Sequence, residues 1–455
     1  MVLNRDADAR LAVARDASGL EMVPEAVARA ESADEVVAVI QEASSLGMPV
    51  TAAGSQTSMT GASITGRGIL LSLSAMNRVI DVDEKTAKAR VEPGVTIGQL
   101  NRELAPLDLM FAPDPTSEED ATIGGAIACN ASGARSLYYG ATRRHVSGVR
   151  VVHADGSASS YGRSHGEKNT VGYAAAQDPV DWFVGSEGTL GIVVEAELSL
   201  VKKPSNIVGL AVPFPSPGNA LEFVVAAREG KSDRMARCLE YFDSAALAIA
   251  GESLGIAWAP DASGMIYLED DAGDGTVDIV LRSWLSLAEI HSAMADDIQV
   301  FEGAQPLRDA RVMRHSVPAT MNERGSAQIN NGGRKVSTDW AVPYRLLEQA
   351  LAASAAAVAK FGAPPPVTYG HAGNGHPHQN FIASDASELG VINSAIEETL
   401  AHVIGVGGTV SAEHGLGKLK QKWLGLQLSQ RQIAVMHAIK NTLDPSGMFA
   451  PGNVL

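Results

Sequence analysis

The chain has 455 residues, of which 45% are apolar and 19% charged, and its formal net charge at pH 7 is −16. This composition is typical of a folded globular protein with roughly two or three domains. The acidic charge excludes a general nucleic-acid binder, which needs a basic surface, and disfavours adsorption to anionic membranes. Two cysteines, Cys129 and Cys238, are too few for a disulfide framework, a cysteine-based zinc site or an iron–sulfur cluster.

The sequence predicts neither a membrane-spanning helix nor a secretory signal. No run of about 18 uninterrupted apolar residues occurs, so the sequence predicts no membrane-spanning helix. The opening residues MVLNRDADAR lack the apolar segment of a secretory signal. With so few cysteines, we expect a cytoplasmic protein, either free or at the membrane periphery. The oligomeric state stays open, with a homodimer among the options.

The first half of the chain predicts alternating helices and strands. Ser32 and Glu35 form a capping-box pattern at the start of a helix, and Gly47 follows that helix where a C-cap glycine belongs. Turn signals at 83–85 and 155–156 predict two hairpins. The predicted strands are residues 49–52, 69–73, 79–82, 87–91, 149–152 and 192–200, and a short helix is predicted over 96–106.

The second half begins after a proline cluster at residues 202–218, which predicts a domain boundary. Beyond it, an alanine-rich helix over 344–360 is entered through Pro343 and ends at Gly362. The further predicted elements are strands at 367–369 and 379–382, a helix at 388–404 and a turn-rich tail from residue 443.

Three stretches are rich in glycine and hydroxyl residues, at positions 53–61, 121–133 and 184–192. Small residues let backbone amides approach a phosphate closely, and hydroxyls add donors. For any one stretch alone, an ordinary tight turn is the commoner explanation. Neither the Rossmann fingerprint nor a Walker A motif occurs, so a nucleotide would be bound by another fold.

A histidine cluster occupies the second half. His371, His376 and His378 surround a glycine-rich turn, and Glu413 and His414 follow 35 residues later. A turn over 373–377, with His371 at the end of one strand and His378 at the start of the next, would let the two imidazoles point into one space. Glu413 would then complete a set of two histidines and one carboxylate, which suits zinc, manganese or another divalent ion. For a lone histidine, a purely structural role is more common.

The glycine-rich stretches, with Val-Glu-Pro-Gly-Val at 91–95 and Pro-Asp-Pro at 113–115, stand in an order that resembles the FAD-linked oxidases. These share the vanillyl-alcohol-oxidase type of flavin fold. Within them the chain most resembles the D-2-hydroxyacid dehydrogenases, which include D-lactate and D-2-hydroxyglutarate dehydrogenases and the D subunit of glycolate oxidase. The resemblance runs from about Pro24 to Asn453.

The resemblance implies an α+β fold. A two-subdomain FAD-binding domain is expected at residues 1–205, and an antiparallel-sheet cap domain covered by helices, with the substrate and metal sites, at 206–427. Residues 428–455 are expected to return to the FAD domain. The first loop lacks the histidine that tethers FAD in some relatives, so FAD is expected to bind non-covalently. The implied FAD-binding residues are Ala53, Gly54, Ser55, Gln56, Thr57, Ser58, Met59, Pro113, Asp114, Thr122, Gly124, Gly125, Asn130, Ser132, Gly133, Gly188, Thr189, Gly191, Ile192 and Asn453.

The resemblance also implies roles around the histidine cluster. His371, His378 and Glu413 become ligands of a divalent metal, zinc or manganese, and His414 becomes the catalytic base. Arg314 matches an arginine that grips the substrate carboxylate. Lys335 falls two residues before the lysine of the hydroxyglutarate-type enzymes, which favours a lactate-like site without excluding a dicarboxylate.

This sequence departs from the family motif at three positions. Asn374, His376 and Pro377 replace the usual Asp, Asn and apolar residue. The change at 374 removes a negative charge beside the expected metal. His376 could donate a hydrogen bond to a metal ligand, act as an extra ligand or contact the substrate, so the identity of the metal stays open.

The expected function is flavin-dependent oxidation of a D-2-hydroxy acid to the 2-oxo acid. The substrate is chelated by the metal, His414 takes the hydroxyl proton and the hydride passes to FAD N5. Without an iron–sulfur relay, electrons leave to a separate acceptor: a quinone, a cytochrome, an electron-transfer flavoprotein or oxygen. One alternative is an oxidase of the same fold that acts on another alcohol, a sugar or an unusual carboxylate with oxygen. A second is a metal-dependent hydrolase without flavin.

Overall fold

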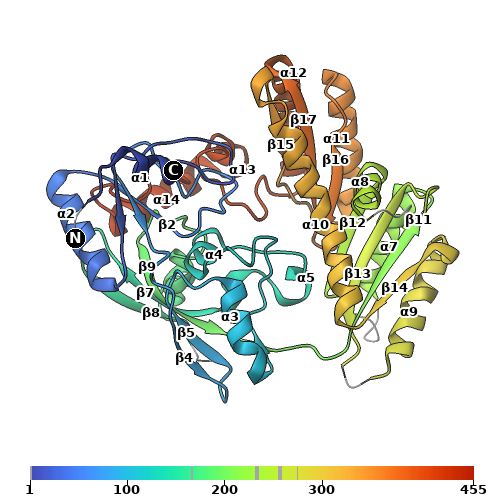
Figure 1. The fold of residues 1–455 in the computed structure, drawn as a ribbon, viewed down its shortest axis with the longest axis horizontal. Helices are drawn as coiled ribbons and strands as arrows, with labels where there is room; N and C mark the ends of the chain where they lie inside the picture. Colours follow the sequence, from blue (N-terminus) through green and yellow to red (C-terminus); the bar gives the residue numbers. More distant parts are fainter. Residues whose placement is uncertain (1–2, 165, 167, 231–234, 255–258, 274) are drawn as a thin grey trace. The chain divides into compact units, whose positions relative to one another are not determined.

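The computed structural model describes residues 3–164, 166, 168–230, 235–254, 259–273 and 275–455 (Figure 1). The chain forms two compact units. Unit 1 comprises Met1–Gly133, Tyr139–Lys203 and Glu413–Leu455. Unit 2 comprises Ala134–Tyr138 and Pro204–Ala412. The main passage into unit 2, at Pro204, falls two residues before the expected first residue of the second domain, 206. The earlier short passage at Ala134–Tyr138 lies inside the range expected for the FAD-binding domain, 1–205.

Unit 1 contains a parallel three-stranded sheet in the order β1-β3-β2, an antiparallel five-stranded sheet in the order β4-β5-β9-β7-β8, and the pair β10-β6. Its strands are β1 (Ala26–Arg29), β2 (Val50–Ala53), β3 (Ile69–Ser72), β4 (Val79–Asp83), β5 (Lys88–Val91), β6 (Leu109–Met110), β7 (Val146–Val152), β8 (Ala158–Gly162), β9 (Ile192–Ser199) and β10 (Val201–Lys202). Its helices are α1 (Ala7–Ala12), α2 (Ala33–Leu46), α3 (Ile97–Leu104), α4 (Ile123–Cys129), α6 (Ala174–Gln177), α13 (Leu424–Gln427) and α14 (Gln430–Leu443). Both predicted hairpins are confirmed, as β4–β5 and β7–β8.

The caps of α2 largely follow the sequence prediction. Ser32 Oγ accepts a hydrogen bond from the Glu35 amide at 3.3 Å, and Gly47 ends the helix in the left-handed conformation with φ 62°. The reciprocal half of the predicted capping box is wrong. Glu35 Oε2 accepts from the amide of Glu31 at 2.7 Å, one residue earlier than a capping box requires.

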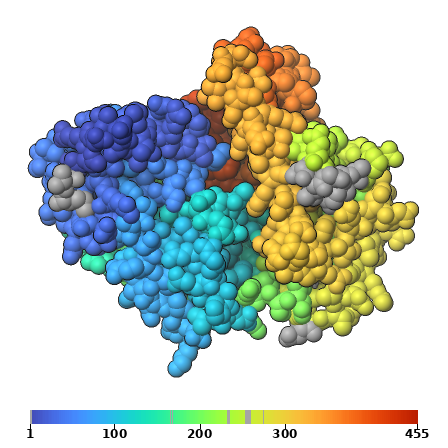
Figure 2. Space-filling model, viewed as in Figure 1, coloured from blue at the N-terminus to red at the C-terminus, as the bar shows by residue number. Residues whose placement is uncertain are grey.

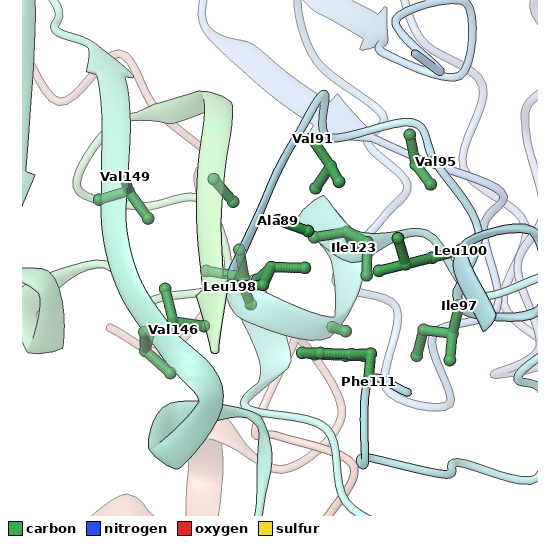
Figure 3. Packing of buried hydrophobic residues seen from close by; sticks show 14 of the residues in the cluster. Ala89, Val91, Val95, Ile97, Leu100, Phe111, Ile123, Val146, Val149 and Leu198 are labelled. Atoms are coloured by element: carbon green, nitrogen blue, oxygen red, sulfur yellow. The ribbon is translucent and has the colours of Figure 1, made fainter. Parts of the chain in front are cut away.

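The core of the five-stranded sheet is closed by α3 and α4 (Figure 3). Val91, Leu100, Ile123 and Leu198 are fully buried there. Along β9 the burial alternates residue by residue, because successive side chains of a strand point to opposite faces. The loop that follows α4 and the loop that precedes β9 therefore adjoin elements packed into the core.

The C-terminal part of the chain returns to unit 1 at Glu413, earlier than the expected residue 428. The amides of Lys418 and Leu419 donate to Thr60 O at 2.9 and 3.2 Å, which ties this segment to unit 1 well before α14 begins. Further on, Phe449 forms a parallel bridge to Val50 at the edge of the three-stranded sheet.

Unit 2 is an antiparallel seven-stranded sheet in the order β14-β11-β13-β12-β16-β17-β15. Its strands are β11 (Ile207–Phe214), β12 (Cys238–Asp243), β13 (Gly264–Asp271), β14 (Gln299–Glu302), β15 (Gly332–Ser337), β16 (Val367–His371) and β17 (His376–Asp385). Its helices are α7 (Pro217–Glu229), α8 (Ser244–Leu254), α9 (Val277–Ile290), α10 (Ala304–Ser326), α11 (Leu347–Phe361) and α12 (Ala386–Gly405), and α5 (Ser136–Tyr139) spans the change from unit 2 to unit 1.

The expected antiparallel sheet covered by helices is confirmed, and the helices lie on both of its faces. On one face α8 and α10 pack on Phe242 and Tyr267, with Met313 of α10 fully buried. On the other face Phe223 of α7 contacts Phe214 of β11 and Trp284 of α9. Much of α10 lies at the surface on its outward side (Figure 2). The α10 face is the one that carries the histidine cluster.

Three local predictions need correction. The proline cluster does not end at residue 218 as a linker, because Pro213 lies within β11 and Pro217 is the first residue of α7. The alanine-rich helix begins at Leu347, since Tyr344–Leu346 forms a 3-10 turn after Pro343. The second strand of the histidine hairpin begins at His376 and not at His378.

Among the described residues, no helix combines the length and apolarity that crossing a membrane requires.

Candidate functional site

The three glycine-rich stretches meet in unit 1 around α4. A Cβ atom added at Gly54 would lie 2.2 Å from Thr122 Oγ1, so only glycine lets the first loop approach α4 so closely. The amides of Gly185 and Glu187 donate to the carbonyls of Ile127 and Ala128 at 2.9 and 2.8 Å. The first and third stretches thus both rest on the second.

Two polar side chains join these loops to the C-terminal segment. Asn453 Nδ2 donates to Ala62 O at 2.8 Å and to Glu187 O at 3.2 Å. Lys418 Nζ donates to Asn453 Oδ1 at 2.6 Å and to Gly61 O at 3.0 Å. Burial lowers the pKa of Lys418 to about 8, although Asp16 and Glu187 raise it. Neither Lys418 nor Glu187 was predicted from the sequence as a site residue.

Other positions of these loops also require glycine, because a neighbouring segment of the chain lies too close for a side chain. A Cβ at Gly124 would lie 2.7 Å from Pro93 Cβ, and one at Gly133 would lie 2.1 Å from Asp114 O. Gly188 has φ +73°, and no described atom lies within 4 Å of its would-be Cβ. Closely packed backbone that borders open space, with hydroxyl side chains nearby, fits the diphosphate and flat ring of FAD.

Several predicted FAD-binding residues use their side chains to hold the loops together. Gln56 Nε2 donates to Val13 O at 2.9 Å, and Asn130, which ends α4 at φ 51°, accepts from the Arg143 amide at 2.8 Å. Thr122 Oγ1 caps α4 by accepting from the Gly125 amide. The Thr189 hydroxyl donates to Ser186 O, and Ile192 is buried in the core. In a cofactor site these residues would hold the loops in place or contact FAD through backbone atoms.

The remaining predicted residues of the first loop and second stretch line the same region with different exposure. Ser58 Oγ accepts from the Ala62 amide at 3.2 Å and so shapes the loop. The buried members are Ala53 and Pro113; the partly exposed ones are Thr57, Met59, Asp114, Gly125 and Ser132, and Ser55 is exposed.

The predicted catalytic loop Glu413–Gly417 is also anchored in unit 1. Ser132 Oγ donates to Glu413 Oε1 at 2.9 Å, and Thr60 Oγ1 donates to the carbonyl of His414 at 3.2 Å. The amides of Leu416 and Gly417 donate to the buried carboxylate of Glu187 at 2.6 and 2.7 Å. Desolvation raises the pKa of Glu187 in spite of these hydrogen bonds, so its carboxylate is a buried support for this loop.

The histidines of unit 2 lie on one face of the β16–β17 hairpin. His371 pairs with His376 and Tyr369 pairs with His378 across the two strands. Since side chains two apart in a strand share a face, all four belong to the same face. The tight connection depends on Gly375, with φ +67°, where a Cβ would lie 1.9 Å from Val342 O.

The imidazoles face one another at metal-ligand spacing. His371 Nε2 and His378 Nε2 are 3.4 Å apart. The potential ligand atoms of His371, His376 and His378 all lie within 4.8 Å of one another. Two nitrogens at about 2.1 Å from a tetrahedral ion would be about 3.4 Å apart. The donor set therefore fits a divalent metal such as zinc.

A buried carboxylate that was not predicted from the sequence organises this cluster. Glu240 of β12 places Oε1 2.6 Å from His371 Nδ1, and its Oε2 accepts from Arg314 Nε at 2.6 Å. Burial raises the pKa of Glu240, but Arg314 and His371 outweigh it and hold the pKa well below its usual range. A carboxylate on the far nitrogen of a ligating histidine is a recurrent feature of metal sites. In the sequence, the sign of this buried carboxylate is an acidic residue inside the otherwise apolar run 238–242.

Asp339 is a second buried carboxylate next to the cluster. Its Oδ1 lies 3.2 Å from His376 Nε2, and both side chains are almost fully buried. Its Oδ2 accepts from Ser411 Oγ at 2.9 Å, and its carbonyl accepts from the Ala412 amide at 2.8 Å. Asp339 thus holds the end of unit 2 from which the chain continues into Glu413.

The two predicted basic residues have different surroundings. Arg314 of α10 places Nη2 3.4 Å from His371 Nε2, so the structure brings it to the histidine cluster. Lys335 of β15 instead donates from Nζ to Asn322 Oδ1 of α10. Burial lowers the pKa of Lys335. The described hydrogen bond of Lys335 is thus made to α10 and not to the histidine cluster.

The closely packed glycine loops of unit 1 and the histidine–carboxylate cluster of unit 2 suit a flavoprotein oxidoreductase. Residues 24–161 match the FAD binding domain family, and residues 203–454 match the C-terminal domain of the FAD linked oxidases. The chain belongs to the family of FAD-linked oxidases.

Relatives of known function match almost the whole chain. The glycolate oxidase subunit GlcD of Bacillus subtilis is 30% identical over 443 residues, which cover 95% of this chain and 89% of that protein. A D-lactate dehydrogenase of Archaeoglobus fulgidus is 29% identical over 94% of this chain and 91% of its own. A D-2-hydroxyglutarate dehydrogenase of Stutzerimonas stutzeri is 27% identical over 99% and 95%.

Solved structures support the fold. An alkyldihydroxyacetonephosphate synthase superposes with a TM-score of 0.74 at 18% identity and covers 99% of this chain and 83% of its own. A p-cresol methylhydroxylase superposes with a TM-score of 0.73 at 16% identity and covers 99% and 93%. The vanillyl-alcohol-oxidase type of FAD-binding domain with an antiparallel-sheet domain covered by helices is therefore confirmed.

Proposed function

We propose that the protein oxidises a D-2-hydroxy acid of the lactate, glycolate or 2-hydroxyglutarate class to the 2-oxo acid. Relatives named for these substrates align with nearly the full chain. The observation that carries the proposal is the histidine face of unit 2, where imidazoles face one another beside a guanidinium held by a buried carboxylate. An anionic, chelating substrate needs a local positive site of this kind in a protein whose net charge is −16.

The proposed roles follow from the positions of the side chains. His371, His378 and Glu413 would hold a divalent ion, and Glu413 directly follows Ala412, the last residue of unit 2. Such an ion would supply Lewis-acid chemistry at the substrate hydroxyl and lower its pKa. Arg314 binds the carboxylate, since Glu240 fixes the direction of its guanidinium.

His414 takes the hydroxyl proton, because a neutral imidazole accepts a proton near physiological pH. The unit 1 loops would hold FAD non-covalently, and the bound flavin would supply the two-electron acceptor for the α-hydride of the substrate. The substrate loses one proton and one hydride, and the 2-oxo acid leaves. A separate acceptor, either a small molecule or a protein, then takes the two electrons.

The test is anaerobic mixing of the FAD-loaded, metal-loaded protein with D- and L-lactate, glycolate and D-2-hydroxyglutarate. We expect D-isomers or glycolate to abolish the visible flavin absorbance. A His414→Ala variant should reduce its flavin about 100- to 10,000-fold more slowly, and His437→Asn, at an exposed position in α14, should not. Unchanged absorbance with the whole panel would overturn the proposal. Bleaching only by other alcohols or sugars would favour the alternative oxidase.

A further inference from the structure

His376 distinguishes this histidine face. It is the side chain directly opposite His371 in the hairpin, and side chains at such positions have Cβ atoms about 4.5–5.5 Å apart. The ring centroid of His376 lies 5.4 Å from that of His371 and 4.6 Å from that of His378. The three imidazoles therefore form a compact triangle within unit 2.

The surroundings of His376 are those of a held ligand. Its side chain is 3% exposed and its Nε2 faces Asp339 Oδ1 at 3.2 Å. The Asp339 side chain is 1% exposed and is itself held by Ser411. His371 also faces a buried carboxylate, because Glu240 Oε1 lies 2.6 Å from its Nδ1, a closer contact than the 3.2 Å at His376. A buried carboxylate on one ring nitrogen orients the other nitrogen and makes it more basic.

We propose that His376 is a third imidazole ligand, positioned by Asp339, of the metal centre described under the proposed function, on which this inference rests. The site would therefore select borderline ions of the zinc type over manganese. Three neutral nitrogen donors suit Zn²⁺, Co²⁺ or Ni²⁺, whereas Mn²⁺ prefers carboxylate and water oxygens. Asn374, the other departure in this turn, is exposed and adds no donor to the buried triangle.

The first experiment uses the FAD-containing protein stripped of metal with a chelator and dialysed against Zn²⁺ or Mn²⁺, with bound metal counted by mass spectrometry. We expect His376→Asn to lower the ratio of zinc to manganese affinity at least about tenfold, and Asp339→Asn to lower it in the same direction. His437→Asn, on the exposed surface of α14, is the matched control and should leave the ratio unchanged. An unchanged ratio in His376→Asn contradicts the proposal.

A second measurement needs no variant. X-ray absorption at the zinc edge of the wild-type protein counts imidazole ligands, and we expect three. Two imidazoles, or no zinc bound at all, would overturn the proposal even if both variants fail to fold. Flavin bleaching by hydroxy acids, recorded on the same samples, separates the two ideas. If the flavin is bleached normally but only two imidazoles bind zinc, the role of His376 is refuted and the proposed function stands. If three imidazoles bind zinc but no hydroxy acid bleaches the flavin, the proposed substrate is refuted and the role of His376 stands.

Discussion

The two units carry candidate sites of opposite construction. In unit 1 the loops approach one another because side chains are missing, as at Gly54 and Gly133. In unit 2 the sheet face is filled with buried charged and imidazole groups, such as Glu240 and Glu269, each held by an arginine. A site built from close backbone should be sensitive to added volume. A site built from buried charge pairs should be sensitive to the loss of one partner.

The largest expected effect is on the folding of unit 2. Glu269 accepts from Arg135 Nε and Nη2 at 2.9 and 2.8 Å and from Arg237 Nη1 at 3.0 Å. Glu269→Gln leaves two buried guanidinium groups without their carboxylate, which should cost about 3–5 kcal/mol in urea denaturation. Glu229→Gln, in a more exposed pair with Arg345, is the control and should cost less than about 1 kcal/mol. Equal losses in the two variants would contradict the comparison.

The same carboxylate predicts a pH dependence. Burial raises the pKa of Glu269, but Arg135 and Arg237 outweigh it and lower the pKa from 4.5 to about 2. Because the folded protein binds this proton less readily than the unfolded chain, the stabilisation is present above pH 4.5 and is lost as the pH falls toward 2. We expect wild-type protein to lose stability more steeply in this window than Glu269→Gln. Parallel stability curves would show that Glu269 does not titrate as described.

The second effect tests volume in unit 1. Gly133→Ala places a methyl group 2.1 Å from the backbone oxygen of Asp114, and the required shift should cost about 3 kcal/mol. We expect the purified variant to retain little FAD, as measured by the ratio of flavin to protein absorbance. Gly425→Ala in α13 is the control, because no described atom lies within 4 Å of its would-be Cβ. Full flavin occupancy in Gly133→Ala would argue that these loops are not a cofactor cradle.

A third test removes a charge with little change of volume. The Glu240→Gln variant loses the negative charge that faces His371 Nδ1 and that forms the ion pair with Arg314. We expect zinc affinity and the rate of flavin reduction by a hydroxy acid to fall about 10- to 100-fold. FAD content should not change, since Glu240 belongs to unit 2. A variant that loses FAD but keeps its zinc affinity would reverse the assignment of the two units.

The smallest effect concerns α14, in the C-terminal segment of unit 1. Ser429 Oγ accepts from the Gln432 amide, and Gln432 Oε1 accepts from the Ser429 amide at 2.9 Å. Ser429→Ala should cost about 1 kcal/mol in thermal unfolding without a change in zinc affinity. Ser429→Asp, which keeps a capping oxygen, should recover most of the loss. If alanine and aspartate behave alike, the cap does not contribute.

Short-range signals in the sequence were sufficient for many elements. Ser32 and Gly47 bound α2 as predicted, and the turn at 155–156 joins β7 to β8. The histidine hairpin was also foreseeable, but its second strand begins two residues early, at His376. That shift puts His376 opposite His371 and so inside the cluster. Register depends on the turn geometry around Gly375, which the sequence pattern alone did not resolve.

By itself, the sequence determined the family, the glycine-rich loops and the histidine pattern, because each is written in residues close together in the chain. Only the tertiary structure decided which distant groups support them. Glu240 reaches His371 because β12 lies beside β16, across 131 positions of sequence. Lys335 meets Asn322 because α10 packs on β15. Such pairings follow from strand order and helix packing, which are set by burial of the whole sheet and not by any local run of residues.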